Sequence, residues 1–481
     1  MIRYCLFWIY GCIGAPLAVD MGQTSKCFTV FRPHARRLDV AVGNWRNAYE
    51  IGETIMDLRA IAFILFILMY VIMIAKPNWK IYAIWGVAIV FMLVGILRPN
   101  PLYILSVINW NVLMMIGGTM LVVWFFIESK MPNLLADIIL DKCANVMWVI
   151  ILMSLFAGAV SAFIDNVATV LMIAPVALAV CKKLDISPVS MILSIAVSSN
   201  LQGAATLVGD TTSIMLGDYA NMNFMEFFWM HGRPGIFWSV ELGALMTVPV
   251  MIFLFHKYRQ PVEANEKTVV TDYFPTIALC GIVVALIVAS FIPNTPDMIN
   301  GIICMTIAAI CMIYDYARHR SHLNLKHAIA SVDADTLLIL AGLFIVIRGI
   351  TDVGLIDAAA DLIVRAGGSN IFMLYTIIVW GSVLFSAFID NIPYVATMLP
   401  IITGICQLLG IEPYLLYFGL LTGATLGGNI TPIGASANIT AVGMLKAGGY
   451  EVSFGDFMKI GLPFTLAAVL TGYAFIWVFW A

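Results

Sequence analysis

Charged residues are scarce in this chain of 481 residues. Asp, Glu, Lys and Arg together make up 11% of it, whereas a soluble globular domain carries about 25%. Combined with a hydrophobic content of 62%, this shortage excludes a soluble domain and predicts a helical integral membrane protein surrounded by lipid. The formal net charge of −3 offers no basic surface, so we expect no nucleic-acid partner.

Paired cysteines and buried histidines are also missing. The nine cysteines are scattered singly with no CxxC pair, which argues against a disulfide framework and against a metal centre. The six histidines fall in or beside polar stretches rather than inside apolar ones, which argues against a histidine proton relay.

One hexapeptide, Ser-Ala-Phe-Ile-Asp-Asn, occurs twice, at 161–166 and at 386–391. Each copy lies in an apolar stretch, where a charged side chain costs roughly 2.5 to 3.5 kcal/mol to insert and is therefore usually functional. The same offset of 225 residues relates Thr206 to Thr431 and several glycines, with no gap. The sequence therefore predicts a duplicated unit.

Apolar segments predict ten spans and two hairpins. The spans are expected at 58–75, 81–98, 103–127, 187–217, 234–256, 273–291, 297–316, 334–352, 414–446 and 456–480. Two more segments, 146–181 and 371–407, are too long for one crossing and too interrupted for two, so each predicts a re-entrant hairpin with the hexapeptide at its tip. Each half then has five spans and one hairpin, and this odd number of crossings predicts an inverted repeat.

These patterns divide the chain into five parts. Residues 1–19 are typical of a signal peptide or a weak first span, and residues 20–55 are polar. The first repeat is expected at 56–258 and the second at 273–481, joined by a linker at 259–272. The predicted fold is an all-α polytopic membrane protein with discontinuous helices.

Loop charges predict the orientation. The loops at 256–267 and 317–327 are basic, whereas the loop at 292–297 has no Lys or Arg. The positive-inside rule places both basic loops in the cytoplasm, in a bacterial-type plasma membrane. The Arg-rich stretch at 32–46 would then lie outside, which leaves two alternatives: translocation after signal cleavage, or a true start further along the chain.

The two tips supply two carboxylates and two amides, from Asp165, Asn166, Asp390 and Asn391. Their oxygens suit Na⁺, and a carboxylate in a low dielectric can also carry a proton. The alternative is that these residues only cap the second helix of each hairpin. We favour an ion site, because Ser would cap equally well without the charge.

A second polar element follows each hairpin, at 198–218 and 422–443. Its Gly, Ser, Thr and Asn residues would unwind a helix unless the exposed backbone lined a cavity. The candidate ligands are Asn200, Thr206, Asp210, Thr212 and Ser213 in the first half, and Asn429, Thr431, Ser436 and Asn438 in the second. Because Asp210 aligns with Ala435, we expect the first half to hold the main cation or proton site.

Three smaller patterns concern interfacial helices, a charged pair and the residues that end at Asp210. The stretches 132–142 and 355–366 predict amphipathic interfacial helices that lead into the hairpins. Arg348 and Asp352 are predicted to pair at the i,i+4 spacing of a helix. The residues that end at Asp210 read Leu-Val-Gly-Asp rather than GxGD, which argues against a membrane aspartyl protease and against an enzyme in general.

The paired motifs resemble the ion transporter superfamily. SAFIDN followed by VATVLMIAPV, then SNLQGAATLVGD and GGNITPIGASAN, is similar to arsenite permeases, NhaD-type Na⁺/H⁺ antiporters and P-protein-like permeases with a citrate-transporter-like domain. The likeness covers about residues 58–480 and implies inverted repeats, a homodimer and an elevator mechanism. It also adds Ser386 to the ion path. The Ser-Asn-Thr tips of dicarboxylate transporters are absent, which argues against citrate or succinate as substrate.

The lead interpretation is a secondary active transporter that exchanges Na⁺ for protons by alternating access. Asp165 and Asp390 would bind Na⁺ or titrate in turn, and no cofactor is expected beyond the coupling ion, Na⁺ or H⁺. The alternative is Na⁺- or H⁺-coupled transport of a small anion or a neutral oxyacid. The sequence leaves both open.

Overall fold

The computed structural model describes residues 58–183, 186–262, 268–319, 322–368 and 370–481. The expectations for 1–19 and 20–55 therefore lie outside the described residues, as does the centre of the predicted linker.

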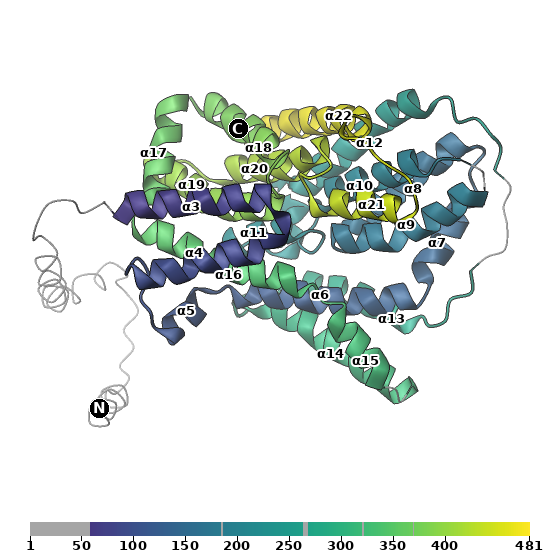
Figure 1. The fold of residues 1–481 in the computed structure, drawn as a ribbon, viewed down its shortest axis with the longest axis horizontal. Coiled ribbons are helices and arrows are strands. Elements are labelled where there is room, and N and C mark those ends of the chain that lie inside the picture. Colours follow the sequence, from purple (N-terminus) through teal and green to yellow (C-terminus); the bar gives the residue numbers. More distant parts are fainter. Residues whose placement is uncertain (1–57, 184–185, 263–267, 320–321, 369) are drawn as a thin grey trace, which may run out of the picture. The chain divides into compact units, whose positions relative to one another are not determined.

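Helices make up most of the described chain (Figure 1). The first half contains α3 (Leu58–Ala75), η1 (Pro77–Trp79), α4 (Lys80–Leu93), α5 (Pro101–Val107), α6 (Trp110–Glu128), α7 (Met131–Leu140), α8 (Val146–Ser161), α9 (Asn166–Lys183), α10 (Val189–Gly203), α11 (Thr211–Tyr219), η2 (Phe224–Phe227), β1 (Trp229–Met230), β2 (Arg233–Pro234) and α12 (Ile236–Phe255). The second half contains α13 (Phe274–Ser290), α14 (Ile299–His319), α15 (His322–Ala330), α16 (Ala334–Asp352), α17 (Leu355–Gly367), α18 (Ile371–Ser386), α19 (Asn391–Leu409), α20 (Tyr414–Gly427), η3 (Gly428–Ile430), α21 (Ser436–Ala447) and α22 (Phe454–Trp480). Strands β1 and β2 pair antiparallel.

Seven of the described helices are long and apolar enough to cross a membrane. They are α3, α6, α12, α14, α16, α19 and α22. This supports a polytopic membrane protein, which the scarcity of charge predicted.

The ten predicted spans are not matched helix for helix. The segment 103–127 divides into α5 and α6, because Ile108 is extended and Asn109 caps α6 through a bond from the Val112 amide. The segments 187–217 and 414–446 are interrupted, as the polar elements at 198–218 and 422–443 predicted. Helix α4 has only 14 residues. Apolar length alone therefore overstated the continuity of the helices.

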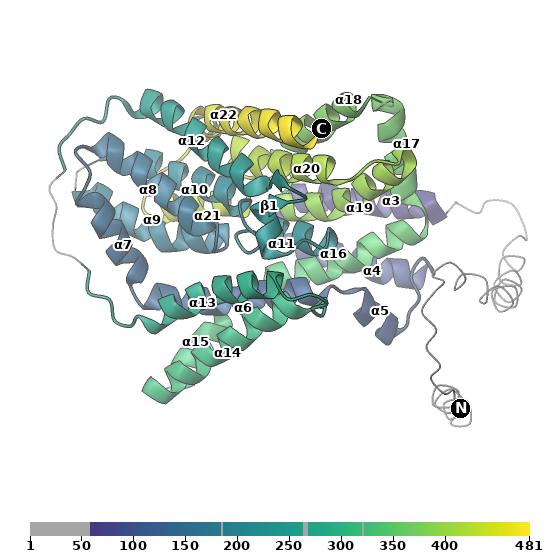
Figure 2. The ribbon, with the colours of Figure 1, turned by 180° about the vertical axis from the view of Figure 1, so that it is seen from behind.

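The helices on either side of each hexapeptide pack beside an interrupted helix. Helices α8 and α9 contact α10, and α18 and α19 contact α20. Helices of the two halves also contact one another: α9 contacts α21, and α11 contacts α19. Figures 1 and 2 show α7 and α17 at opposite ends of this arrangement. Their bounds fit the predicted amphipathic helices.

The two interruptions are the breaks between α10 and α11, at 204–210, and between η3 and α21, at 431–435. Each packs against a hexapeptide through a glycine. A Cβ on Gly209 would lie 2.5 Å from the Gly203 carbonyl oxygen and 2.7 Å from that of Ala162. A Cβ on Gly434 would lie 2.6 Å from the Gly428 oxygen. Only glycine allows the backbones to approach this closely. The repeated glycines therefore fix how the interruptions pack on the hexapeptides, and we name the region where they meet the polar centre.

Candidate functional site

The polar candidates meet where the two hexapeptides contact the two interruptions. Buried hydroxyls fasten each interruption to its own hexapeptide. Thr206 donates to the Ala162 carbonyl and Thr431 donates to the Ala387 carbonyl, at the same offset. Ser213 adds a bond to the Gly203 carbonyl at 3.2 Å.

The hexapeptide serines form similar but unequal bonds. Ser199 donates to the Ser161 hydroxyl at 3.1 Å and also to the Asn166 carbonyl at 3.1 Å. Ser386 donates instead to the Ala424 carbonyl at 2.5 Å. These bonds connect each hexapeptide to the helix that precedes the interruption, α10 in the first half and α20 in the second.

Four buried asparagines connect the halves. The Asn166 amide donates to Asn200 at 2.8 Å, and Asn200 donates to Asn429 at 2.8 Å and Asn438 at 2.9 Å. Asn429 and Asn438 in turn donate to backbone carbonyls of Val197, Gly428 and Thr431 at 2.9 to 3.0 Å. Three of these asparagines are 0% exposed and Asn166 is 5% exposed. We name this group the amide chain.

Asp165 acts as the N-cap of α9. Its Oδ2 accepts the backbone N–H groups of Val167 at 3.0 Å and Ala168 at 3.2 Å. Capping is therefore one role of Asp165, as the alternative from the sequence proposed. It does not account for the charge, because an uncharged Ser would make the same bonds.

Asp210 is almost completely buried where α11 begins. Thr212 donates to its Oδ2 at 2.6 Å, and Thr212 lies 3.4 Å from Thr425 of the second half. A Cβ on Gly209, the residue before Asp210, would lie 2.7 Å from the carbonyl oxygens of Ser161 and Ala162. Asp210 therefore lies next to the first hexapeptide.

Asp390 has a partner that the sequence did not predict. The Lys80 ammonium lies 2.7 Å from Oδ2 of Asp390, and Ser436 donates to the same oxygen at 3.1 Å. The remaining oxygen, Oδ1, has no hydrogen-bond partner among the described residues. The sequence shows Lys80 directly before an apolar segment, which marks it as a lysine near the membrane. It does not show the pairing, because Asp390 lies 310 residues away along the chain.

Asn391 also lacks a partner in the described chain. Its side chain is 3% exposed, and its Nδ2 makes no hydrogen bond there. The Asn166 amide has Asn200 as acceptor, whereas Thr425 occupies the position that corresponds to Asn200 in the second half. The second tip therefore keeps unused polar atoms.

A cavity of about 260 Å³ lies beside Asp390. It is lined by the turn between α3 and α4, the beginning of α16 and the second tip, with polar groups from Asn78, Lys80, Asp333, Asp335, Thr336, Asp390 and Ser436. Of the sequence candidates, only Asp390 and Ser436 line it. The cavity leaves space beside Asp390 that a small ion can fill.

Another cavity, of about 400 Å³, lies near the other end of α16. Asp218 lines it and accepts hydrogen bonds from Asn109 and from Asn111, the latter at 2.6 Å. Arg348, also in its lining, lies 2.9 Å from Asp352, which confirms the predicted i,i+4 pair. The two cavities touch different parts of α16 and α19.

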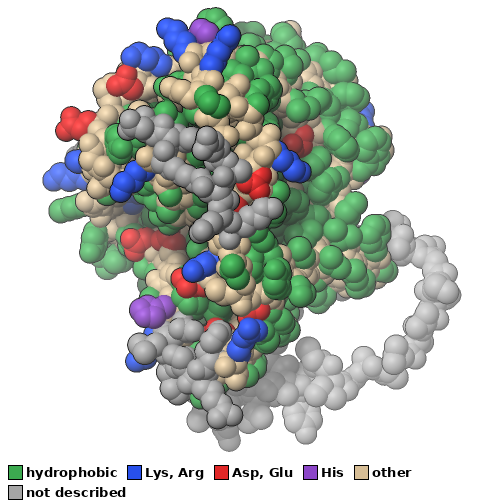
Figure 3. Space-filling view, turned by 90° about the vertical axis from the view of Figure 1, so that its right-hand side faces the viewer, with side chains coloured by type: hydrophobic (Ala, Val, Ile, Leu, Met, Phe, Trp, Pro, Cys, Tyr) green, Lys and Arg blue, Asp and Glu red, His purple; other side chains and the backbone are tan. Residues whose placement is uncertain are grey.

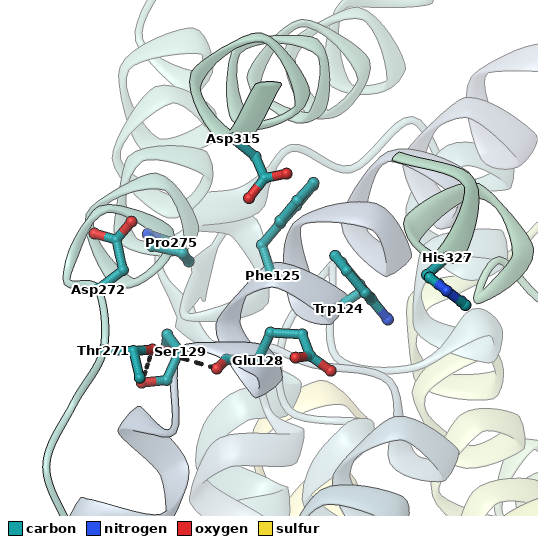
Figure 4. Close-up of a pocket in the computed structure, with 9 residues that line it drawn as sticks. All are labelled: Trp124, Phe125, Glu128, Ser129, Thr271, Asp272, Pro275, Asp315 and His327. Carbon is teal, nitrogen blue, oxygen red and sulfur yellow. Dashed lines mark hydrogen bonds between the residues drawn. The ribbon is translucent and has the colours of Figure 1, made fainter. Parts of the chain in front are cut away.

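A third cavity, of about 380 Å³, contains none of the candidates (Figure 4). Glu128, Asp272, Asp315 and His327 line it, and the figure shows that they come from separate segments. Arg318 pairs with Asp272 at 3.3 Å. Within the described ranges, no group of three or more His, Cys, Asp or Glu could hold a metal ion. This cavity is therefore separate from the polar centre.

Comparisons with known proteins agree with this architecture. The family model described as citrate transporter matches residues 63–423 and again 305–481. An uncharacterised transporter of Mycobacterium bovis is 30% identical over 432 residues, covering 88% of this chain and 98% of that protein. The human P protein is 23% identical, covering 79% of this chain and 55% of that protein.

A solved structure has a related fold. The YdaH transporter of Alcanivorax borkumensis superposes with a TM-score of 0.55 at 15% identity, covering 81% of this chain and 87% of that one. At this identity the likeness concerns the fold alone. Together with the family match, these relatives identify the chain as a membrane transporter, not an enzyme, and it belongs to the citrate transporter family.

Proposed function

We propose that this secondary transporter couples its cargo to a cation that binds the acidic residues of the two tips, most simply by exchanging Na⁺ for H⁺. The observation that carries the proposal is an acidic side chain at each tip, Asp165 and Asp390, with Asp210 at the interruption that packs against the first tip. Carboxylates at and beside the tips attract cations and disfavour a free anion. Carboxylate, amide and hydroxyl oxygens are also hard ligands of the kind that Na⁺ accepts.

Alternating access by an inverted repeat is the mechanism we infer. Its support is the recurrence of equivalent contacts at a constant offset, together with α7 and α17 at opposite ends (Figure 1). The cavities near the two ends of α16 are candidate mouths for the two access states. In an elevator movement, the hairpins and interrupted helices would shift together against α4, α6, α14 and α16.

Sidedness and assembly extend the proposal. By the positive-inside rule, the basic loops favour a cytoplasmic location for the end that carries α7. Figure 3 shows charged side chains on that end and hydrophobic side chains along the flank at the right, as expected of an aqueous face beside a membrane surface. We expect a homodimer in a plasma membrane, which crosslinking in native membranes would test.

The test is flux in proteoliposomes with a pH-sensitive dye. The wild-type protein is expected to move protons when Na⁺ is added on the opposite side. Asp165→Asn and Asp390→Asn should each abolish this coupling. Coupled flux that survives both substitutions would refute the proposal.

Coupled transport of a small anion is the second candidate. The description of the matched family model and the Lys80 ammonium in the cavity favour it. The acidic centre would then require Na⁺ or H⁺ to bind first, so uptake of labelled citrate, succinate or arsenite should depend on the coupling ion. Na⁺/H⁺ exchange without any added anion would exclude this candidate as the main activity.

A further inference from the structure

We propose that Lys80 is a tethered cation that competes with the transported cation for Asp390 and holds the unloaded second tip in place, an inference that rests on the function proposed above. Its observations are the ion pair, the unused oxygen of Asp390 and the acidic cavity beside them.

The ion pair is close and largely shielded from water. Nζ of Lys80 lies 2.7 Å from Oδ2 of Asp390, and the two side chains are 18% and 10% exposed. A pair in such surroundings interacts much more strongly than one on an open surface. A transported cation must therefore displace the ammonium or share the carboxylate with it.

The carboxylate can accept a competitor because half of it is unused. Oδ1 of Asp390 is buried and has no hydrogen-bond partner in the described chain. Ser436 contacts only Oδ2, beside Lys80. A cation that enters from the cavity can thus bind Oδ1 first and weaken the attraction between Oδ2 and the ammonium.

The displaced ammonium has other acidic partners. Asp333 and Asp335, at the beginning of α16, line the same cavity as Lys80. Both oxygens of Asp333 accept hydrogen bonds from Thr336, at 3.1 and 2.6 Å, which keeps this carboxylate oriented. Lys80 can therefore leave Asp390 without losing all of its negative neighbours.

The pair also connects two groups of helices. Lys80 is the first residue of α4, which packs against α3 and α16, whereas Asp390 belongs to the tip between α18 and α19. The tip cannot move far relative to α4 while the pair is intact. Loading of Asp390 would release this connection.

Among the described residues, the first tip has no ion pair equivalent to that of Lys80 and Asp390. At the offset of 225 residues, Lys80 corresponds to Met305, and Asp165 is bound by backbone amides of its own helix. In the part of the chain that the structure describes, competition by a tethered cation therefore concerns the second tip.

The experiment measures ²²Na⁺ flux and its pH profile with the full-length protein in proteoliposomes. The charged groups that line the cavity beside Asp390 are Lys80 on α4 and Asp333 and Asp335 at the beginning of α16. Lys80→Met removes the competitor, so the half-saturating Na⁺ concentration should fall about tenfold. The pH midpoint should rise by about one unit, because a carboxylate without an adjacent ammonium binds protons more readily.

Two further variants make the test decisive. Lys80→Arg keeps the charge and can bind a carboxylate with two parallel bonds, so the half-saturating Na⁺ concentration should rise. Lys76→Met is the matched control, because this nearby lysine lies over Trp79 rather than beside Asp390. The control should behave like the wild-type protein.

The possible results separate the two proposals. Absence of any Na⁺- or H⁺-dependent flux in the wild-type protein overturns the proposed function. Coupled flux in the wild type, with Lys80→Met matching Lys76→Met in both half-saturation and pH midpoint, overturns the role of Lys80 alone. If Lys80→Met does not fold, an unchanged half-saturation in Lys80→Arg has the same consequence.

Discussion

The two tips share six residues, yet their aspartates have different partners. Asp165 accepts two backbone amides of its own helix, whereas Asp390 binds Lys80 and Ser436. The amides differ as well, because Asn166 has an acceptor and Asn391 has none in the described chain. Residues outside the hexapeptides, on α4 and on the interrupted helices, therefore decide the chemistry of each copy.

The location of the main cation site stays a prediction. Asp210 led us to expect that site in the first half, and Asp210 is 2% exposed. At the second tip, a cavity lies beside Asp390, and Oδ1 of Asp390 and Nδ2 of Asn391 have no hydrogen-bond partner among the described residues.

The largest effect is expected from Asp390→Asn. It should abolish coupled flux and lower the free energy of unfolding by about 3 kcal/mol, because it leaves a shielded Lys80 without its main partner. Thermal unfolding in detergent measures the stability. The double variant Lys80→Met with Asp390→Asn should recover most of that stability but not the flux. A stable single variant would mean that the pair contributes little.

Asp165→Ser should distinguish the role of Asp165 as a helix cap from its role in coupled flux. The hydroxyl can keep the cap on α9, so the free energy of unfolding should change by less than about 1 kcal/mol, while coupled flux is lost. Proteoliposome flux and thermal unfolding are measured side by side, with Asp165→Ala as the variant that loses the cap. Normal flux in Asp165→Ser would reduce Asp165 to a structural residue.

Gly209→Ala and Gly434→Ala should affect both halves alike. Each new methyl group would meet backbone oxygens at 2.5 to 2.7 Å, so each should cost about 1 to 3 kcal/mol of stability. Gly443→Ala is the control, since a Cβ there meets nothing within 4 Å. A large effect at only one of the two glycines would show that the interruptions are not packed equivalently.

Asn200→Thr should make the Asn166 amide more like the Asn391 amide, which has no hydrogen-bond acceptor in the described chain. It gives the first half the residue that stands at Thr425 in the second. It removes the acceptor of the Asn166 amide and the donor to Asn429 and Asn438, and the Thr hydroxyl can replace at most one of these three bonds. The expected loss is about 2 to 3 kcal/mol in the free energy of unfolding. Denaturation of purified protein would measure it, and an unchanged stability would mean that another group accepts the bond.

Local patterns carried much of the prediction. Polar residues inside apolar segments marked the places where α10 and α20 end, and the amphipathic stretches marked α7 and α17. The pairing of Lys80 with Asp390 had no such signal, because it depends on how distant helices pack. The division at Ile108 was missed for another reason, since apolar length says nothing about where the backbone turns extended.

The amide chain has one further consequence. Its four side chains carry no charge and do not titrate near neutral pH, so a change of pH leaves the donors and acceptors of these bonds the same. The contact between the two halves therefore does not depend on protonation. Under the proposed function, cation or proton binding would change the charge of the neighbouring carboxylates while these uncharged bonds hold the two halves together.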